Sequence, residues 1–238
     1  MAYSGISKPS LHFNTKLYTG TGSSNSLTGV GFQPDWTWIK KRNGATNHMV
    51  VDAVRGVTKT LVINTTVAED TDAYSLTAFG ADGFTVGSTG AVNGNNDTFA
   101  SWNWKANGAG SANTDGSTNS TVSVNSTAGF SIVKFSGDPS SSATIGHGLG
   151  VAPSMIITKS RGSTDNWVIY HKNLGASAYI ELDNAGAKGT SGSVYRWNNT
   201  APTNSVFSVG AGSGTNNSSQ IAYCFAEKTG YSKFGSYT

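Results

Sequence analysis

The residues best suited to binding chemistry are the six tryptophans, two of which, Trp167 and Trp197, have polar neighbours. An aromatic plane beside amides and carboxylates can bind a sugar, because the C–H face of the sugar stacks on the ring and its hydroxyls form hydrogen bonds. For Trp167, which falls inside an expected strand, burial is the favoured interpretation. The sequence therefore predicts a ligand-binding loop surface made of Asp165, Asn166, Trp197, Asn198 and Asn199.

The other four tryptophans form two pairs, Trp36 with Trp38 and Trp102 with Trp104. A spacing of two puts both members of a pair on the same face of a β-strand. The favoured interpretation is an aromatic core or a seam between subunits. We therefore expect these residues to hold the structure together and the loops of the second half to bind.

Residues for catalysis or metal binding are sparse. The 13 acidic residues are scattered, and their one cluster, Glu69-Asp70-Thr71-Asp72, lacks the spacing of a calcium loop, so a solvated loop is favoured over a calcium site. The four histidines show no zinc-type pairing, and the single cysteine, Cys224, lies in an apolar run that predicts a buried thiol. We predict a protein that is not an enzyme and has no cofactor or metal.

The composition predicts a polar surface with little charge. Charged residues make up only 12% of the chain, the formal net charge is +3, and the longest basic run is Lys40-Lys41-Arg42. A nucleic-acid interface normally needs a basic stripe, so this class of partner is not expected. No run approaches the roughly 18 apolar residues of a membrane span, and the first residues lack the pattern of a signal peptide. We expect no membrane insertion.

A repeated phrase organises the chain. The sequence G-V-G-F-Q-P-D-W-T-W-I-K-K-R at 29–42 recurs as G-L-G-V-A-P-S-M-I-I-T-K-S-R at 148–161, an offset of 119 residues. Matches continue outward, and Ala100-Ser101-Trp102 aligns with Ala222-Tyr223-Cys224 when the offset grows in the loops. The length of the repeat, about a hundred residues, is that of a domain. The sequence therefore predicts two tandem copies of one domain.

The pattern within each copy predicts an all-β fold. Short runs of β-branched and aromatic residues alternate with Gly-rich turns, and no stretch of twelve residues has a helical period. We predict two tandem duplicated β-sandwich domains of jelly-roll or lectin-like type. The expected parts are an N-terminal arm at 1–12, a first sandwich at 13–106, a Gly/Ser/Thr/Asn-rich linker at 107–128, a second sandwich at 129–229 and a C-terminal strand at 230–238.

Several phrases resemble a family of tandem-repeat structural proteins of tailed bacteriophages, especially marine ones. They are the 29–42 phrase, D-A-V-R-G at 52–56, D-G-F-T-V-G at 82–87, W-N-W-K at 102–105 and A-Y-C-F-A-E-K-T-G-Y-S-K-F-G-S-Y-T at the end. The resemblance covers nearly the whole chain from Phe13 onward and supplies no catalytic residues.

The resemblance implies a virion protein made in the cytoplasm of a host bacterium. The expected function is a tail fibre or surface adhesin that binds host-surface glycans. A capsid decoration protein or another architectural subunit is the alternative, and a glycan depolymerase is a remote one. The expected partners are other virion proteins and further copies of the chain, because low charge and many aromatic residues favour a homotrimer.

Overall fold

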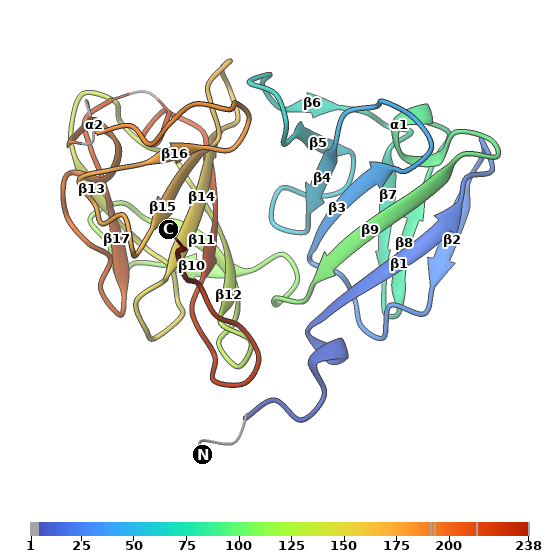
Figure 1. Ribbon diagram of the computed structural model, residues 1–238, viewed down its shortest axis with the longest axis horizontal. Helices are drawn as coiled ribbons and strands as arrows, with labels where there is room; N and C mark the ends of the chain where they lie inside the picture. Colours follow the sequence, from blue (N-terminus) through green and yellow to red (C-terminus); the bar gives the residue numbers. More distant parts are fainter. Residues whose placement is uncertain (1–4, 191, 193, 213, 238) are drawn as a thin grey trace. The chain divides into compact units, whose positions relative to one another are not determined.

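The computed structural model describes residues 5–190, 192, 194–212 and 214–237 (Figure 1). The fold is nearly all-β, as predicted, with 39% strand and 5% helix. The chain divides into two compact units, Lys8–Ala109 and a second that consists mainly of Gly110–Thr238. We call them the N-terminal unit and the C-terminal unit. Within the described residues, no helix is long and apolar enough to cross a membrane.

The N-terminal unit is a sandwich of two antiparallel sheets. Its large sheet has the order β1-β9-β3-β4-β5-β6 and its small sheet the order β2-β8-β7. Apolar side chains of both sheets, such as Ile39, Phe84 and Phe99, share one core. The elements are η1 (Pro9–Leu11), β1 (Phe13–Thr19), β2 (Asn25–Thr28), β3 (Trp36–Lys41), β4 (Met49–Asp52), β5 (Lys59–Val62), β6 (Asp70–Thr71), β7 (Leu76–Gly80), β8 (Gly83–Val86), α1 (Gly90–Asn93) and β9 (Thr98–Trp104).

The C-terminal unit is also a sandwich. Its large sheet has the order β10-β11-β12-β18-β14-β15-β16 and packs on the two-stranded sheet β13-β17. Val133, Ile156 and Phe207 belong to the core between the sheets. The elements are β10 (Ser111–Asn113), β11 (Ser120–Asn125), β12 (Phe130–Phe135), β13 (Ala143–Gly146), β14 (Met155–Ser160), β15 (Val168–His171), β16 (Ile180–Glu181), α2 (Val194–Trp197), β17 (Val206–Val209) and β18 (Gln220–Phe225).

The two units have the same order of corresponding strands. The run β1-β9-β3-β4-β5 corresponds to β12-β18-β14-β15-β16, and the pair β2-β8 corresponds to β13-β17. Two copies of one domain would have this common order. A shared origin by duplication stays a prediction.

The strand register corrects one detail of the sequence alignment. Trp102 lies opposite Trp38, and Tyr223 lies opposite Ile157, which follows Trp38 by 119 residues. Trp102 therefore corresponds to Tyr223, whereas the sequence alignment had placed it against Cys224. A one-residue shift turns a side chain to the other face of the sheet. Cys224 accordingly faces the core of its unit, where it is a buried free thiol.

A fully buried asparagine joins the strands of each unit in the same way. In each unit the side-chain Nδ2 of this asparagine donates to the carbonyl six residues earlier in the chain. It also donates to a carbonyl in the loop that follows β1 or β12. The side-chain oxygen accepts a hydrogen bond from a backbone N–H of the same loop. A buried amide is stable when it is hydrogen-bonded. The partners are Gly87, Ser23 and Thr21 for Asn93, and Gly210, Ser141 and Asp138 for Asn216.

The expected linker at 107–128 is wrong, because this segment contains β10 and β11, which extend the large sheet of the C-terminal unit beyond β12. Val122 and Val124 explain the strand. The two valines are two positions apart, so they point to the same face of the sheet. On that face Val122 belongs to the core of the C-terminal unit and Val124 packs against it. This strand is hard to predict from the sequence, because the segment contains few apolar residues among many Ser, Thr and Asn residues.

The expected strand at 230–238 is also absent from the part of this tail that the structure describes, 230–237. Instead, Lys228 and Ser232 close a tight turn, and the backbone N–H of Phe234 donates to Glu227. The Phe234 ring contacts Phe225, with 6.1 Å between centroids. The backbone bridge of this turn and the contacts of Phe234 therefore hold the tail without a β-strand. At the other end, residues 1–4 of the expected arm lie outside the described residues, and Pro9–Leu11 forms a short 3-10 helix.

Candidate functional site: an aromatic pocket in the N-terminal unit

The structure contradicts the predicted role of Trp197 as the central residue of the sugar site. Trp197 ends α2 with only 1% of its surface exposed and belongs to the core of the C-terminal unit. Its ring meets Tyr170 edge to face at 5.9 Å. A sugar cannot stack on a ring that solvent does not reach, so the prediction of a Trp197 platform is wrong. Trp167 is fully buried, as favoured.

The four polar residues of the predicted surface lie in two loops. Asp165 accepts hydrogen bonds from Ser163 and Asn217, which tie down the loop between β14 and β15. Asn198 and Asn199 follow α2 with φ angles of 50° and 48°, a left-handed turn that asparagine tolerates. Asn166 is half-buried. Ligand binding by these four residues stays a prediction, now without the aromatic ring that motivated it.

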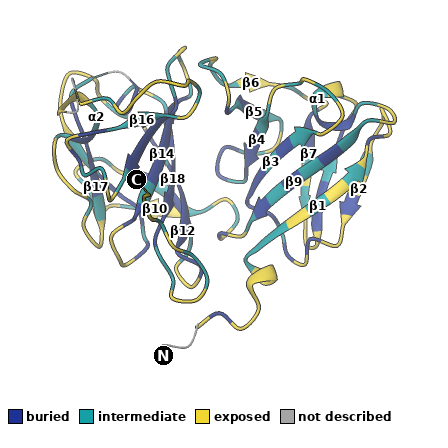
Figure 2. Ribbon diagram, viewed as in Figure 1, coloured by how far each residue is buried: buried dark blue, intermediate teal, exposed yellow. Residues whose placement is uncertain are grey.

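An aromatic pocket lies instead on the N-terminal unit. Trp38, Trp102, Trp104 and His48 line a cavity of about 180 Å³, and all four are half-buried. Strand geometry brings them together: Trp38 is directly opposite Trp102 in the register of β3 and β9, and period two puts Trp104 on the same face. Along β9, residues of intermediate burial alternate with buried ones, as the colours of Figure 2 indicate.

Ring contacts hold the walls of the pocket in place. Trp38 meets Trp102 at 5.8 Å with an interplanar angle of 64°, and it meets His48 at 5.8 Å. On the same face of β3, the ring centroid of the buried Trp36 lies 4.4 Å from that of Trp104 and 6.3 Å from that of Trp38. These separations and tilts are those of favourable aromatic pairs. The pocket is thus a rigid surface on strands, which needs little ordering before a ligand binds.

His48 gives this apolar pocket one polar group. The indole Nε1–H of Trp38 donates to Nδ1 of His48 over 3.1 Å, so the neutral imidazole carries its proton on Nε2. Burial, followed by the positive charge of Lys40, lowers the pKa of His48 below its usual value, which favours this neutral form. The neutral imidazole of His48 therefore has one N–H donor, at Nε2, and its ring lines the pocket together with three indole rings.

The pocket suits a small ring that has an apolar face and an acceptor oxygen. Its volume of about 180 Å³ is below the roughly 300–1,000 Å³ of sites for drug-sized ligands. In the described part of the chain, no group of three or more His, Cys, Asp or Glu residues is arranged to hold a metal ion.

The sequence predicted which tryptophans share a face, but it assigned all four to a core or a seam. Trp36, 1% exposed, fits that assignment. Trp38, Trp102 and Trp104 are half-exposed, which does not fit a core, and a seam between subunits stays a prediction for them. His48 was missed because it precedes β4 and carries no motif. The one hint of its role is that His48 directly precedes β4, the strand that pairs with β3 and therefore with the strand of Trp38.

Fold and pocket together define an all-β protein of two sandwich units with an aromatic pocket on one large sheet. Over residues 8–238, the chain matches the family described as a domain of unknown function (DUF7483), and it belongs to that family. Neither the curated proteins nor the solved structures contain a match to this chain.

Proposed function

We propose that this chain is a non-enzymatic virion protein that binds saccharides of the host-cell surface through the aromatic pocket of its N-terminal unit. One observation carries the proposal: three half-exposed indoles and the neutral imidazole of His48 line one small apolar pocket. The indoles match the C–H face of a sugar ring, and the imidazole donor matches a hydroxyl or ring oxygen.

The charge near the pocket favours a neutral sugar over an organic cation. Aromatic cages also bind quaternary ammonium groups, by cation–π attraction. Here the positive charge of Lys40 acts on the pocket residue His48, and it would repel a second cation in the same place. A neutral ring with hydroxyl groups meets no such penalty.

The virion setting rests on the sequence resemblance to structural proteins of tailed bacteriophages. In that setting the chain acts as a tail fibre or surface adhesin, is made in the host cytoplasm, and assembles with other virion proteins. Association into a homotrimer remains part of the proposal, because many copies of a weak sugar site raise the overall affinity for a cell surface.

The test is titration calorimetry with a panel of neutral hexoses and hexosamines on three proteins: wild type, Trp102→Ala and His48→Phe. We expect wild type to bind at least one sugar and Trp102→Ala to lose about tenfold in affinity, the equivalent of roughly 1.4 kcal/mol. His48→Phe keeps a ring but removes the donor, so it should also weaken binding.

Leu17→Ala is the matched control, because this β1 residue is 59% exposed and lies opposite Ala100 rather than a tryptophan. Its affinity should equal that of wild type. Absence of sugar binding by wild type, or equal affinity in all variants, would overturn the proposal and favour a purely architectural role. Thermal unfolding of each variant separates loss of binding from loss of folding.

A further inference from the structure

A second cavity, in the C-terminal unit, has a different chemical character. It has a volume of about 410 Å³, and its wall includes Thr121, Lys134, Ser136, Arg161, Ser218 and Ser219. This volume lies within the roughly 300–1,000 Å³ range of small-molecule sites. None of the ten residues that line it, all of them described, is acidic. We call it the basic groove.

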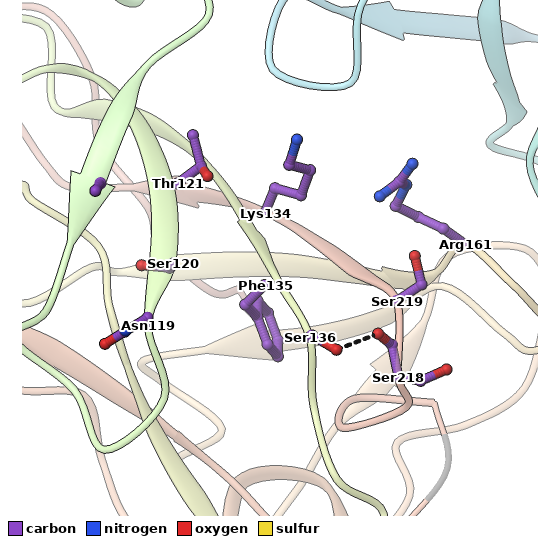
Figure 3. Close-up of a pocket in the computed structure, with 10 residues that line it drawn as sticks. Asn119, Ser120, Thr121, Lys134, Phe135, Ser136, Arg161, Ser218 and Ser219 are labelled. Atoms are coloured by element: carbon purple, nitrogen blue, oxygen red, sulfur yellow. Dashed lines mark hydrogen bonds between the residues drawn. The ribbon is translucent and has the colours of Figure 1, made fainter.

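The strand register places the two cations on one face of the sheet. Lys134 lies opposite Ile221, which in turn lies opposite Lys159, two residues before Arg161. Lys134 and Lys159 are therefore two strand spacings apart at the backbone, roughly 10 Å, and Arg161 lies two residues further along the chain. Figure 3 shows both side chains extending to the same side, with Thr121 next to Lys134 and Ser219 next to Arg161. Long side chains on this scaffold can reach one ligand together.

Hydrogen bonds fix the end of the groove near Arg161. The backbone N–H of Arg161 donates to the carbonyl of Ser219 over 2.8 Å. The hydroxyl of Ser136 donates to the carbonyl of Ser218 over 2.6 Å, as Figure 3 shows. The residues that carry the hydroxyl groups are thus held in position before a ligand arrives.

The groove is a feature of the C-terminal unit alone. β11 supplies Ser120 and Thr121 to its wall, and this strand pairs with β12 on the side where β1 of the N-terminal unit has no further neighbour. The residue that corresponds to Lys134 in β1 is Leu17, opposite Ala100 in the same register. The extra strand and the lysine together make a polar, positively charged wall that the N-terminal unit lacks.

We propose that the basic groove binds an oxyanion group, a carboxylate, sulfate or phosphate, carried by an acidic saccharide. Arg161 offers a planar pair of N–H donors that match the two oxygens of such a group, and Lys134 adds a point charge. The Thr121 and Ser219 hydroxyls donate to the remaining oxygens or to the sugar. This site goes beyond the proposed function, since it is independent of the aromatic pocket.

The experiment is calorimetric titration of the full chain with trigalacturonate, with its uncharged analogue galactotriose and with sodium sulfate alone. We expect trigalacturonate to bind more tightly than galactotriose, with an affinity that falls as salt is added. Lys134→Gln and Arg161→Gln should each weaken trigalacturonate binding at least tenfold. Lys188→Gln, at an exposed residue outside the groove, removes the same charge and should bind like wild type.

Binding of sulfate without trigalacturonate, lost in the same two variants, supports the oxyanion site and assigns its ligand to a free anion. Binding of neither probe at millimolar concentration overturns the proposal, as does equal affinity in Lys134→Gln, Arg161→Gln and wild type. Trp102→Ala should leave trigalacturonate binding unchanged, so failure of the aromatic pocket and failure of the basic groove are separate results.

Discussion

The outer faces of the two large sheets differ although their strands have the same order. The positions of Trp38, His48, Trp102 and Trp104 in the N-terminal unit correspond to Ile157, Trp167, Tyr223 and Phe225 in the C-terminal unit. The first set is half-exposed and lines a pocket, whereas the second set is at most 9% exposed. The same strand order is thus compatible with different side chains on the outer face, and an aromatic pocket can form there in one unit only.

The units also differ at the end of their fourth corresponding strands. In the N-terminal unit, the buried Arg55 pairs with the buried Asp52 and also reaches Glu69 and the carbonyls of Lys59 and Val50. The corresponding residues of the C-terminal unit, 119 positions later, are His171 and Leu174. One unit therefore depends on a buried ion pair at a place where the other has none.

The largest expected effect concerns this ion pair. Arg55→Leu, which introduces the residue type of position 174, should destabilise the N-terminal unit by about 3–5 kcal/mol, because it leaves Asp52 buried without its partner. Denaturant unfolding followed by tryptophan fluorescence measures the change. Lys172→Gln is the control: it breaks the partly exposed pair with Glu227 and should cost less than about 1 kcal/mol. Similar small losses in both variants would contradict the assignment.

The buried asparagines test what the units share. Asn93→Ala and Asn216→Ala each remove the side-chain donor to a buried carbonyl, that of Gly87 or Gly210, so each should cost on the order of 1–3 kcal/mol. Chemical denaturation should show similar losses in the two variants, each confined to its own unit. Asn95→Ala, at an exposed neighbour, should have little effect. A large cost in only one unit would show that the correspondence is superficial.

The C-terminal tail covers part of the outer face of its own unit, because Phe234 contacts Phe225 there. Phe234→Ala removes the ring contact with Phe225, the counterpart of Trp104, and should lower stability by about 0.5–1.5 kcal/mol. The midpoint of thermal unfolding is the measurement. Tyr237→Ala alters a fully exposed side chain and should leave the midpoint unchanged. If both variants unfold like wild type, the tail does not contribute to that face.

The smallest expected effect is a pH dependence at His48. Its pKa in the folded chain is lowered by burial and by Lys40, so the folded state binds fewer protons than the unfolded state just below pH 6.5. Stability should therefore fall as the pH drops from 6.5 through the lowered pKa. Unfolding curves of wild type and His48→Gln across this range measure the difference. Curves that stay parallel would show that His48 does not titrate in this way.

The sequence predicted the fold class because alternating β-branched and aromatic residues, as in Trp36–Ile39, have a period that only strands satisfy. It could not predict which face of β3 is exposed, since a spacing of two fixes only that Trp36 and Trp38 share a face. The site was misplaced for a related reason. Trp197 has polar neighbours in sequence, but its burial comes from tertiary packing against Tyr170.

The most direct test of the sugar site is a ¹H–¹⁵N spectrum of the six indole N–H groups during titration with the sugar that binds best in calorimetry. We expect the signals of Trp38, Trp102 and Trp104 to shift together with one affinity, while those of the buried Trp167 and Trp197 stay in place. Shifts confined to Trp167 and Trp197, or no shift of the three pocket indoles at saturating sugar, would contradict this expectation.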